Sequence, residues 1–314
     1  MNSQQLALVF PGQGSQRVGM LAELGESFSI IKSTFAEASD ALGYDLWDLV
    51  QNGDQAQLNL TETTQPVLLA ASVAIWRLWC EQGGLRPSLL AGHSLGEFSA
   101  LVCAGAIGFA DALRLVRARG QYMQTAVPVG EGAMAAVLGL DDAQIVQICA
   151  EAAAGVGVVE AVNFNSPGQV VIAGQVAAVD KAIALLKAAG AKRAMPLPVS
   201  APFHTSLMRP AGEKLALALA DITVQQPSIP VVHNVHGKIE SDPAAIKALL
   251  VEQISSAVKW VDCVETMVAA GINTTIECGP GKVLSGLNKR INKSLKGLNI
   301  ESPASLVAAL ESIR

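Results

Sequence analysis

The chain has 314 residues and a formal net charge of −5 at pH 7, and apolar residues make up 51% of it. That length can bury a substantial core, in one large domain or in a domain with an insertion. The acidic balance argues against nucleic-acid binding, which requires a basic surface. The five cysteines are dispersed without paired spacing, which is typical of small core residues and not of disulfides or a zinc site.

The apolar segments are too short to span a bilayer. The most apolar one, Val67 to Trp76, is interrupted by Ser72 and closed by Arg77, whereas a spanning helix needs about 20 apolar residues. The first residues carry no basic region, and the apolar run Leu6–Phe10 indicates a strand, so no secretory signal is expected. We therefore expect a cytoplasmic protein that does not associate with membranes.

Short apolar runs separated by helical patterns predict a parallel sheet. The runs are Leu6–Phe10, Leu89–Gly92, Val231–Val235 and Thr274–Cys278. The helical patterns between them are Gln65–Glu81, Asp111–Ala126, Ser206–Ala220, Pro243–Ser255 and Val261–Ala270. Buried strands that alternate with helices indicate an α/β fold with helices on both faces of the sheet.

The middle of the chain has a different pattern, in the order strand, helix, strand, strand, helix, strand. Its segments are Ala133–Gly139, Asp141–Ala153, Gly157–Asn163, Gln169–Ala173, Val176–Ala189 and Lys192–Leu197, with a turn at Asn165–Gly168 that predicts a hairpin. This βαββαβ order is the ferredoxin-like unit. We therefore expect a ferredoxin-like subdomain at 128–198, inserted into a discontinuous core of residues 1–127 and 199–314. A cleft between two such domains is a common ligand site.

A candidate nucleophile lies directly after the second predicted strand. Residues 92–96 read Gly-His-Ser-Leu-Gly and join the strand Leu89–Gly92 to a helix. In this turn the strand bends sharply into the helix and lifts the serine hydroxyl above the sheet, as in hydrolase-like parallel-sheet cores. The free amides and positive dipole end of the helix can stabilise an oxyanion. The pattern predicts Ser94 as a nucleophile, and the alternative is an ordinary serine in a strand-to-helix turn.

A serine nucleophile needs a base, and the chain has four histidines. His93 adjoins the serine but is expected to point in another direction. His233 and His236 follow a later strand and lack a carboxylate or thiol at metal-ligand spacing. His204 lies in the irregular segment Ser200–Thr205, where the small subdomain meets the following helix. A histidine there can reach across a cleft, so we predict His204 as the base.

Two further features concern substrate binding. The loop from Phe10 to Gln16 lacks the residues of a dinucleotide or phosphate loop, but loops at the carboxyl ends of parallel strands meet at the ligand crevice. The amide of Gln13 could therefore join that of Leu95 as an oxyanion donor.

Arg119 projects among apolar residues of its helix, where an unpaired charge is costly. Its partner is either an internal Asp or Glu or a substrate carboxylate bound by the planar guanidinium.

In combination these motifs resemble those of the malonyl-CoA:acyl carrier protein transacylases, and the resemblance covers nearly the whole chain. The matching segments are Phe-Pro-Gly-Gln-Gly-Ser-Gln at 10–16, Gly-His-Ser-Leu-Gly-Glu at 92–97, Arg119, Asn-Phe-Asn-Ser-Pro-Gly-Gln at 163–169, the segment around His204, Gln253, and Glu-Cys-Gly-Pro-Gly-Lys at 277–282.

The resemblance implies a function and a set of roles. Malonyl-CoA and acyl carrier protein would be the partners, with no metal and no bound cofactor, in the supply of extender units for fatty-acid synthesis. Ser94 would be the nucleophile, His204 the base and Arg119 the malonyl clamp. The Gln13 and Leu95 amides would form the oxyanion hole, and a backbone carbonyl would orient the histidine. That carbonyl belongs to Gln253.

One residue departs from the family pattern. Stand-alone bacterial members often carry a smaller residue at the position of Phe203, whereas polyketide-synthase acyltransferases selective for malonyl resemble this Phe-His pair. The ring beside the base predicts exclusion of a methyl branch. It leaves open whether the chain serves fatty-acid or polyketide synthesis.

Carrier docking and the rival functions complete the predictions. The densest basic run is Lys282, Lys289, Arg290, Lys293 and Lys296. We predict carrier docking at Lys289 and Arg290, with a solvated helix face as the alternative.

Two other functions are considered as rivals: an esterase or thioesterase, and a non-catalytic carrier-binding module. The α/β-hydrolases place Asp or Glu between the serine and a late histidine, whereas here a ferredoxin-like unit precedes His204.

Overall fold

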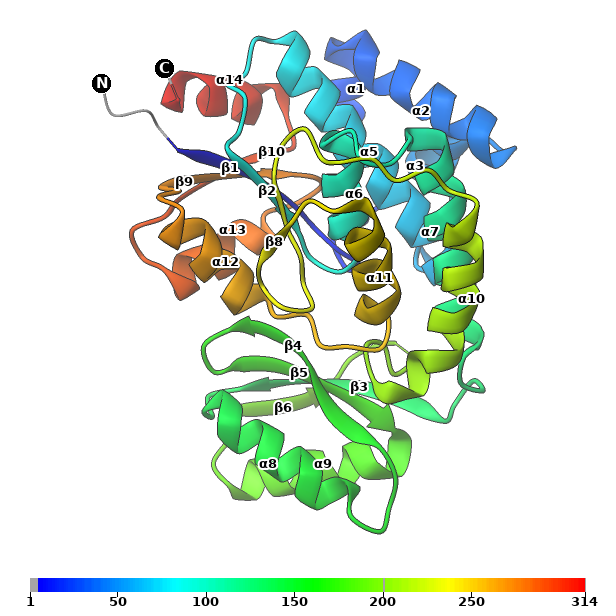
Figure 1. Ribbon diagram of the computed structural model, residues 1–314, viewed down its shortest axis with the longest axis vertical. Helices are drawn as coiled ribbons and strands as arrows, with labels where there is room; N and C mark the ends of the chain where they lie inside the picture. Colours follow the sequence, from blue (N-terminus) through cyan, green and yellow to red (C-terminus); the bar gives the residue numbers. More distant parts are fainter. Residues whose placement is uncertain (1–4, 200, 314) are drawn as a thin grey trace.

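The computed structural model describes residues 5–199 and 201–313, which form two sheets and the helices around them (Figure 1). Residues 1–4 and Ser200, the first residue of the segment predicted to carry the base, lie outside the described residues. The larger sheet has the order β10-β9-β1-β2-β7-β8, parallel except for the β7–β8 pair. Its strands are β1 (Leu6–Phe10), β2 (Leu89–Gly92), β7 (Val231–Val232), β8 (Ile239–Glu240), β9 (Thr274–Cys278) and β10 (Lys296–Ile300).

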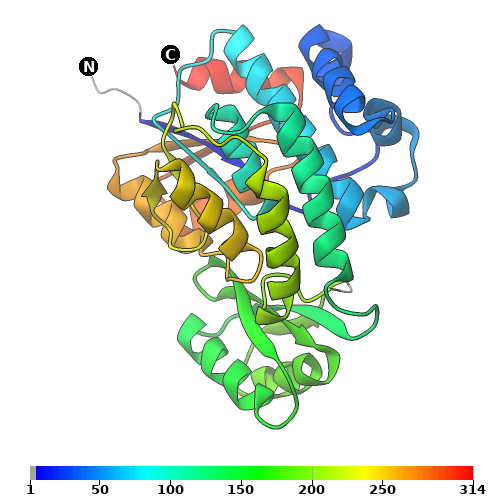
Figure 2. The same cartoon turned by 45° about the vertical axis from the view of Figure 1, so that its right-hand side comes forward.

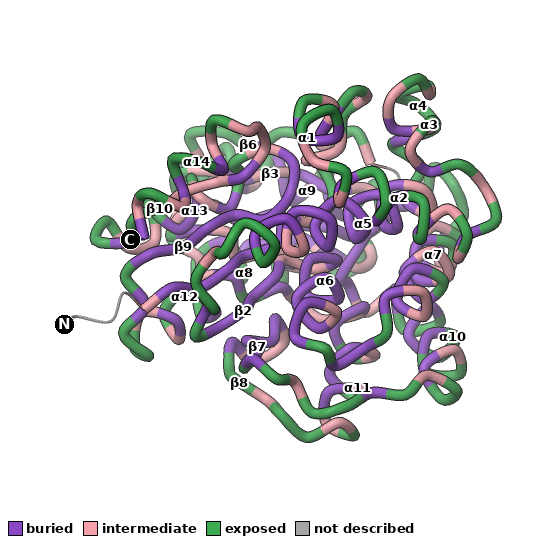
Figure 3. The backbone as a smooth tube through the Cα atoms, turned by 90° about the horizontal axis from the view of Figure 1, so that it is seen from above, coloured by how far each residue is buried: buried purple, intermediate pink, exposed green. Residues whose placement is uncertain are grey.

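Side chains of β1 alternate between two cores, as the period of a strand requires. Leu6, Leu8 and Phe10 belong to the core formed with α1 (Ala22–Ser27), α2 (Ser29–Leu42), α3 (Leu46–Asn52), α4 (Gln55–Leu58), α5 (Thr61–Glu81), α6 (Leu95–Cys103), α7 (Phe109–Thr125), α10 (Arg209–Ala220), α11 (Pro243–Gln253) and α14 (Pro303–Ser312). Ala7 and Val9 face α12 (Trp260–Ala269) and α13 (Val283–Ile291). Figure 3 shows β2 and β9 as buried segments between these helices. The predicted α/β layering is therefore confirmed.

The edges of this sheet differ from the prediction. β10 was not predicted, because Lys-Gly-Leu-Asn-Ile has no continuous apolar run and pairs on one side only. The predicted strand Val231–Val235 ends at Val232, since the two residues that follow turn away from the ladder to contact a buried carboxylate. The predicted helix Ser206–Ala220 begins as a 3₁₀ turn, and its α-helical part starts at Arg209.

The second sheet is antiparallel and lies below the first in both side views (Figures 1 and 2). Its order is β4-β5-β3-β6, made of β3 (Gly132–Leu138), β4 (Val159–Ser166), β5 (Gln169–Gln175) and β6 (Arg193–Pro196). On one face, Val137 and Ile172 pack with α8 (Asp142–Ala153) and α9 (Val176–Ala188). On the other face, Met134 and Val171 join the core of the larger sheet. The predicted sequence of elements in this region is thus observed.

Among the helices of the described residues, none combines the length and the apolar composition needed to cross a membrane.

Candidate active site

Ser94 stands on a sharp turn between β2 and α6. Its backbone has φ 52° and ψ −107°, a left-handed value that is uncommon for a residue other than glycine. A Cβ on Gly92 would lie 1.9 Å from backbone atoms of Gly96, and a Cβ on Gly96 would lie 2.0 Å from the Phe10 carbonyl oxygen. No side chain fits at either position. The two glycines therefore permit the close approach of strand and helix that the Gly-x-Ser-x-Gly pattern predicts.

The side chain of Asn234, two residues after the end of β7, holds this turn. Its Oδ1 accepts a hydrogen bond from the Ser94 amide at 2.7 Å, and its Nδ2 donates to the Gly92 carbonyl at 2.7 Å. Both ends of the strained turn are thus fixed by one amide side chain. Asn234 was not predicted from the sequence. The available signal was its position at the carboxyl end of a parallel strand, where such ends meet.

His204 contacts the serine hydroxyl directly. Its Nε2 lies 2.8 Å from Ser94 Oγ, and its Nδ1 lies 2.9 Å from the carbonyl oxygen of Gln253. Because a carbonyl oxygen can only accept, Nδ1 carries the proton and Nε2 is free to accept one from the serine. Burial, reinforced by the positive charge of Arg119, lowers the pKa of His204 to about 3. The imidazole is therefore neutral, which is the form that acts as a base.

Arg119 reaches the same hydroxyl from α7 and is 1% exposed. One guanidinium nitrogen donates to Gln65 Oε1 at 2.8 Å, and the other donates to Gln253 Oε1 at 2.9 Å and to Ser94 Oγ at 3.2 Å. Burial lowers the pKa of Arg119 to about 10, against the opposing effect of Glu97, so the group keeps its charge at neutral pH.

The two alternatives for this arginine can now be compared. Its direct partners are amide and hydroxyl oxygens, and none of the ion pairs within residues 5–199 and 201–313 includes Arg119. Its Nε has no hydrogen-bond partner within the same ranges. The positive charge therefore lacks a direct counter-ion and faces a cavity, which favours a ligand carboxylate over an internal one.

The cavity beside these groups has a volume of about 580 Å³. Its wall contains Gln13, Gly14, Gln16, Gln55, Asn59, His93, Ser94, Leu95, Arg119, Met123, Met134, Asn163, Leu197, Pro198, Val199, Phe203 and His204. The backbone amides of Gln13 and Leu95 donate to no other residue in the part of the chain that the structure describes. They are therefore available to an oxygen atom of a ligand. The cavity brings together the predicted nucleophile, base, arginine and oxyanion donors.

The remaining predicted residues lie elsewhere or have other contacts. His93 Nε2 lies 2.8 Å from Asn165 Oδ1, so its ring faces the small sheet. Phe203 is 8% exposed and borders the cavity next to the base. Lys289 and Arg290 are exposed on α13 and are not part of the cavity wall, and Arg290 donates to Gln169 Oε1 at 2.6 Å.

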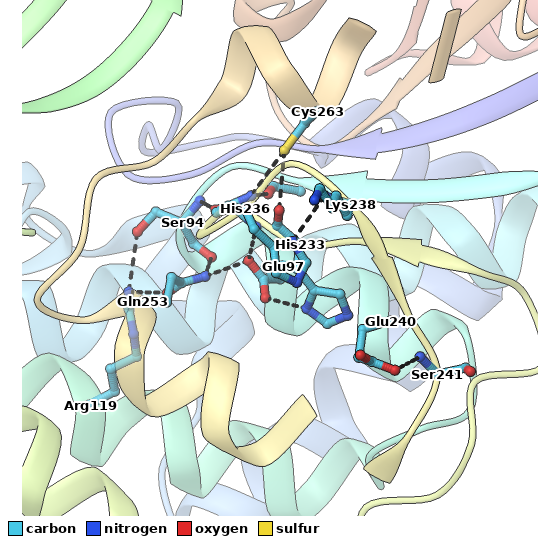
Figure 4. A network of polar contacts seen from close by, with 12 residues as sticks. Ser94, Glu97, Arg119, His233, His236, Lys238, Glu240, Ser241, Gln253 and Cys263 are labelled. Atoms are coloured by element: carbon cyan, nitrogen blue, oxygen red, sulfur yellow. Dashed lines mark hydrogen bonds and ion pairs between the residues drawn. The ribbon is translucent and has the colours of Figure 1, made fainter. Parts of the chain in front are cut away.

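A buried polar network behind the cavity was not predicted (Figure 4). Glu97 and His233 are both 0% exposed and form an ion pair of 2.7 Å between Oε1 and Nδ1. Glu97 is also hydrogen-bonded to Gln253, the residue whose carbonyl holds the base. His233, which sequence analysis set aside as a base, thus has a carboxylate partner 136 residues away in the chain.

Comparison with known proteins identifies the family of this chain. Residues 7–309 match the family model of the acyl transferase domain. The malonyl CoA-acyl carrier protein transacylase of Salmonella typhimurium is 59% identical over 98% of this chain and 99% of its own length. The crystal structure of an acyl carrier protein S-malonyltransferase from Vibrio cholerae is 58% identical, with a TM-score of 0.95 over 97% of this chain and 99% of that one.

A malonyl-transacylase solved in complex with a type II PKS acyl-carrier protein is 56% identical, with a TM-score of 0.96 over 98% of this chain and 99% of that one. Both the matched domain and these identities extend over nearly all of the chain. The chain therefore belongs to the acyl transferase family, as a member of its malonyl CoA-acyl carrier protein transacylases.

Proposed function

We propose that the chain transfers the malonyl group of malonyl-CoA to the phosphopantetheine thiol of acyl carrier protein through an acyl-enzyme on Ser94, and so supplies extender units for fatty-acid biosynthesis. One observation carries the proposal. Ser94 Oγ lies 2.8 Å from a neutral imidazole and 3.2 Å from a buried guanidinium that has no direct counter-ion. A nucleophile, its base and a carboxylate-binding group thus converge on one oxygen atom.

The chemistry follows from these positions. His204 Nε2 accepts the proton as Ser94 Oγ attacks the thioester carbonyl, and the Gln13 and Leu95 amides stabilise the oxyanion. Coenzyme A leaves as the thiol with the proton from His204. Arg119 turns its donors from Ser94 Oγ to the malonyl carboxylate. The carrier thiol then attacks the acyl-enzyme in the reverse sequence, with no metal and no bound cofactor.

We further propose the finer architecture and setting. The β4-β5-β3-β6 order with two helices on one face supports a ferredoxin-like subdomain at 128–198. The Ser94 turn supports a hydrolase-like core at 1–127 and 199–314. A cytoplasmic location fits the substrate, since coenzyme A thioesters are used there.

The test is an acyl-transfer assay with malonyl-CoA and phosphopantetheinylated acyl carrier protein. We expect malonyl-carrier to accumulate at the rate at which free coenzyme A is released. Release of coenzyme A with free malonate as the product would instead identify a thioesterase. No consumption of malonyl-CoA would identify a non-catalytic carrier-binding module.

The acid side of the pH profile tests the base. Because the pKa of His204 is lowered to about 3, its neutral form persists as pH falls, and the malonylation rate should stay nearly constant from about pH 7.5 to about pH 5.5. A histidine with the ordinary pKa of about 6.5 would lose about nine-tenths of its neutral form over that interval. His204→Ala should be slow throughout, with a residual rate that rises at high pH as hydroxide replaces the base. A wild-type midpoint near the ordinary value would contradict this assignment.

Charge reversal tests carrier docking on α13. Lys289→Glu with Arg290→Glu should slow transfer to the acidic carrier protein and weaken the salt dependence of that step. Acylation by malonyl-CoA should change little, because neither residue borders the cavity. Lys187→Glu, at another exposed lysine, on α9, is the matched control. Equal losses in both half-reactions would indicate a structural role, through the contact between Arg290 and Gln169.

The Phe203 ring tests selectivity at the malonyl α-carbon. Phe203→Ser should raise methylmalonyl transfer relative to malonyl transfer, because the ring borders the cavity beside the base. One methyl group is worth about 1–3 kcal/mol in such pockets, so methylmalonyl should not become the preferred substrate. The ratio of kcat/KM values for the two thioesters measures the effect. An unchanged ratio would show that the ring does not contact the α-carbon.

A further inference from the structure

Glu97 is a buried carboxylate that the proposed mechanism does not use. It lies on α6 one turn after Ser94 and is 0% exposed. Its Oε1 lies 2.7 Å from His233 Nδ1, and its Oε2 accepts hydrogen bonds from the amide of Asn234 at 2.9 Å and from Gln253 Nε2 at 2.8 Å. A carboxylate with three donors around it is an acceptor only, so it fixes which atom each neighbour presents to it.

Gln253 is the first neighbour whose orientation Glu97 fixes. Its Nε2 must face Glu97, which leaves its Oε1 to accept from Arg119 Nη2 at 2.9 Å. The opposite orientation of the amide would place its oxygen against the Glu97 carboxylate oxygen and its NH₂ group against the Arg119 donor. Gln253 Nε2 also donates to the Ser94 carbonyl at 3.1 Å, and the Gln253 carbonyl accepts from His204 Nδ1. One glutamine thus contacts the nucleophile's backbone, the base and the guanidinium.

Asn234 is the second neighbour. Its backbone amide is bound by Glu97, and its side chain spans the turn from the Ser94 amide to the Gly92 carbonyl. Figure 4 shows Glu97 between His233 on one side and Ser94 and Gln253 on the other. The strained backbone of the nucleophile is therefore connected to the same carboxylate as the base.

The third neighbour is His233, whose Nδ1 lies 2.7 Å from Glu97 Oε1. Burial alone would lower the pKa of His233, but the adjacent Glu97 carboxylate raises it overall. Buried ion pairs add little net stability compared with apolar residues of similar size, although removing one partner is costly. A purely stabilising role would not require this pair to be connected to three groups of the active site.

We propose that Glu97 is a positioning residue for acyl transfer: through Gln253 it aligns His204 and Arg119, and through Asn234 it holds the Ser94 turn. This inference rests on the proposed function of the site. Its carboxylate acts by the position of its acceptor oxygens and does not touch the acyl group.

Two substitutions separate position from charge. Glu97→Gln keeps an acceptor oxygen where Gln253 and Asn234 need one and turns its amide to His233, so the acylation rate should stay within about tenfold of wild type. Glu97→Asp keeps the charge but withdraws the carboxylate by about 1.5 Å, one carbon–carbon bond. A displacement of that size in a supporting group costs on the order of 10²-fold in rate. We therefore expect the aspartate variant to be the slower one.

The measurement is the single-turnover malonylation rate together with the final fraction of Ser94 that is labelled. Positioning predicts complete but slow labelling of Glu97→Asp. A merely structural role predicts partial labelling at the wild-type rate, because only the folded fraction reacts. Glu277→Asp is the matched control: Glu277 is also 0% exposed and accepts from the Leu284 and Ser285 amides, away from the cavity. It should label at the wild-type rate.

Three outcomes would overturn the inference. These are a wild-type rate for Glu97→Asp, partial labelling of that variant at the wild-type rate, and a Glu97→Gln variant slower than Glu97→Asp, which would assign the effect to charge. Wild-type protein that takes no label from malonyl-CoA would instead overturn the proposed function, and the inference with it.

Discussion

Ser94→Ala is expected to lower the rate of malonyl transfer on the order of 10⁶-fold, the loss that follows removal of a serine nucleophile whose base is left in place. The fold should survive, because among the described side chains Oγ is hydrogen-bonded only to His204 and Arg119. The turn itself is held through the Ser94 amide by Asn234. Transfer rates and thermal unfolding of the variant and wild type measure both expectations.

The control for this variant is a serine that lies outside the cavity wall. Ser99→Ala, at a fully buried position of the helix α6 that follows Ser94, should transfer malonyl at the wild-type rate. Substantial turnover by purified Ser94→Ala would show that another group carries the acyl chain.

Arg119→Ala is expected to lower kcat/KM for malonyl-CoA by about 10²- to 10⁴-fold. Removing one partner of a buried ion pair costs about 3–5 kcal/mol, and about 1.4 kcal/mol corresponds to tenfold. Acetyl-CoA lacks the carboxylate, so kcat/KM for acetyl-CoA should stay the same or rise once the buried cation is removed. The ratio of kcat/KM values for the two thioesters, in variant and wild type, is the measurement.

Arg117→Ala is the matched control for this ratio. Arg117 lies on the same helix but donates to the Leu42 carbonyl and stacks over Tyr44, away from the cavity. Its removal should leave the ratio unchanged. A parallel fall for both thioesters in Arg119→Ala would contradict the clamp and leave Arg119 as a support for Gln253 and Ser94.

The interior of the fold was predictable because its signals are local. Strands β1 and β2 are continuous apolar runs, since both of their faces are covered, and β9 is buried along its whole length although it contains two threonines and a glutamate. The edge strand β10 was not predicted because Lys296 and Gly297 are exposed and the next two residues, Leu298 and Asn299, are only half-buried. β7 was predicted too long because the predicted strand included His233 and Asn234, whose polar groups contact Glu97 and not a neighbouring strand.

The residues of the active site also differ in whether a local sequence pattern predicts them. Ser94 follows from a local glycine pattern, and Arg119 from its position on an apolar helix face. Asn234, by contrast, meets Ser94 across 140 residues, and its position after a predicted strand indicates that it lies near the other strand ends but not that it contacts Ser94. The contribution of Gln253 to the base is a backbone carbonyl, which residue type does not encode, so only the resemblance to a family suggested it.

The most direct test of the account is the mass of the wild-type protein after mixing with malonyl-CoA in the absence of an acceptor. We expect one malonyl group per chain, on the peptide that contains Ser94, and its complete transfer when phosphopantetheinylated carrier protein is added. Ser94→Ala should acquire none under the same conditions. A malonyl group on another residue, or release of malonate without any covalent intermediate, would contradict the account.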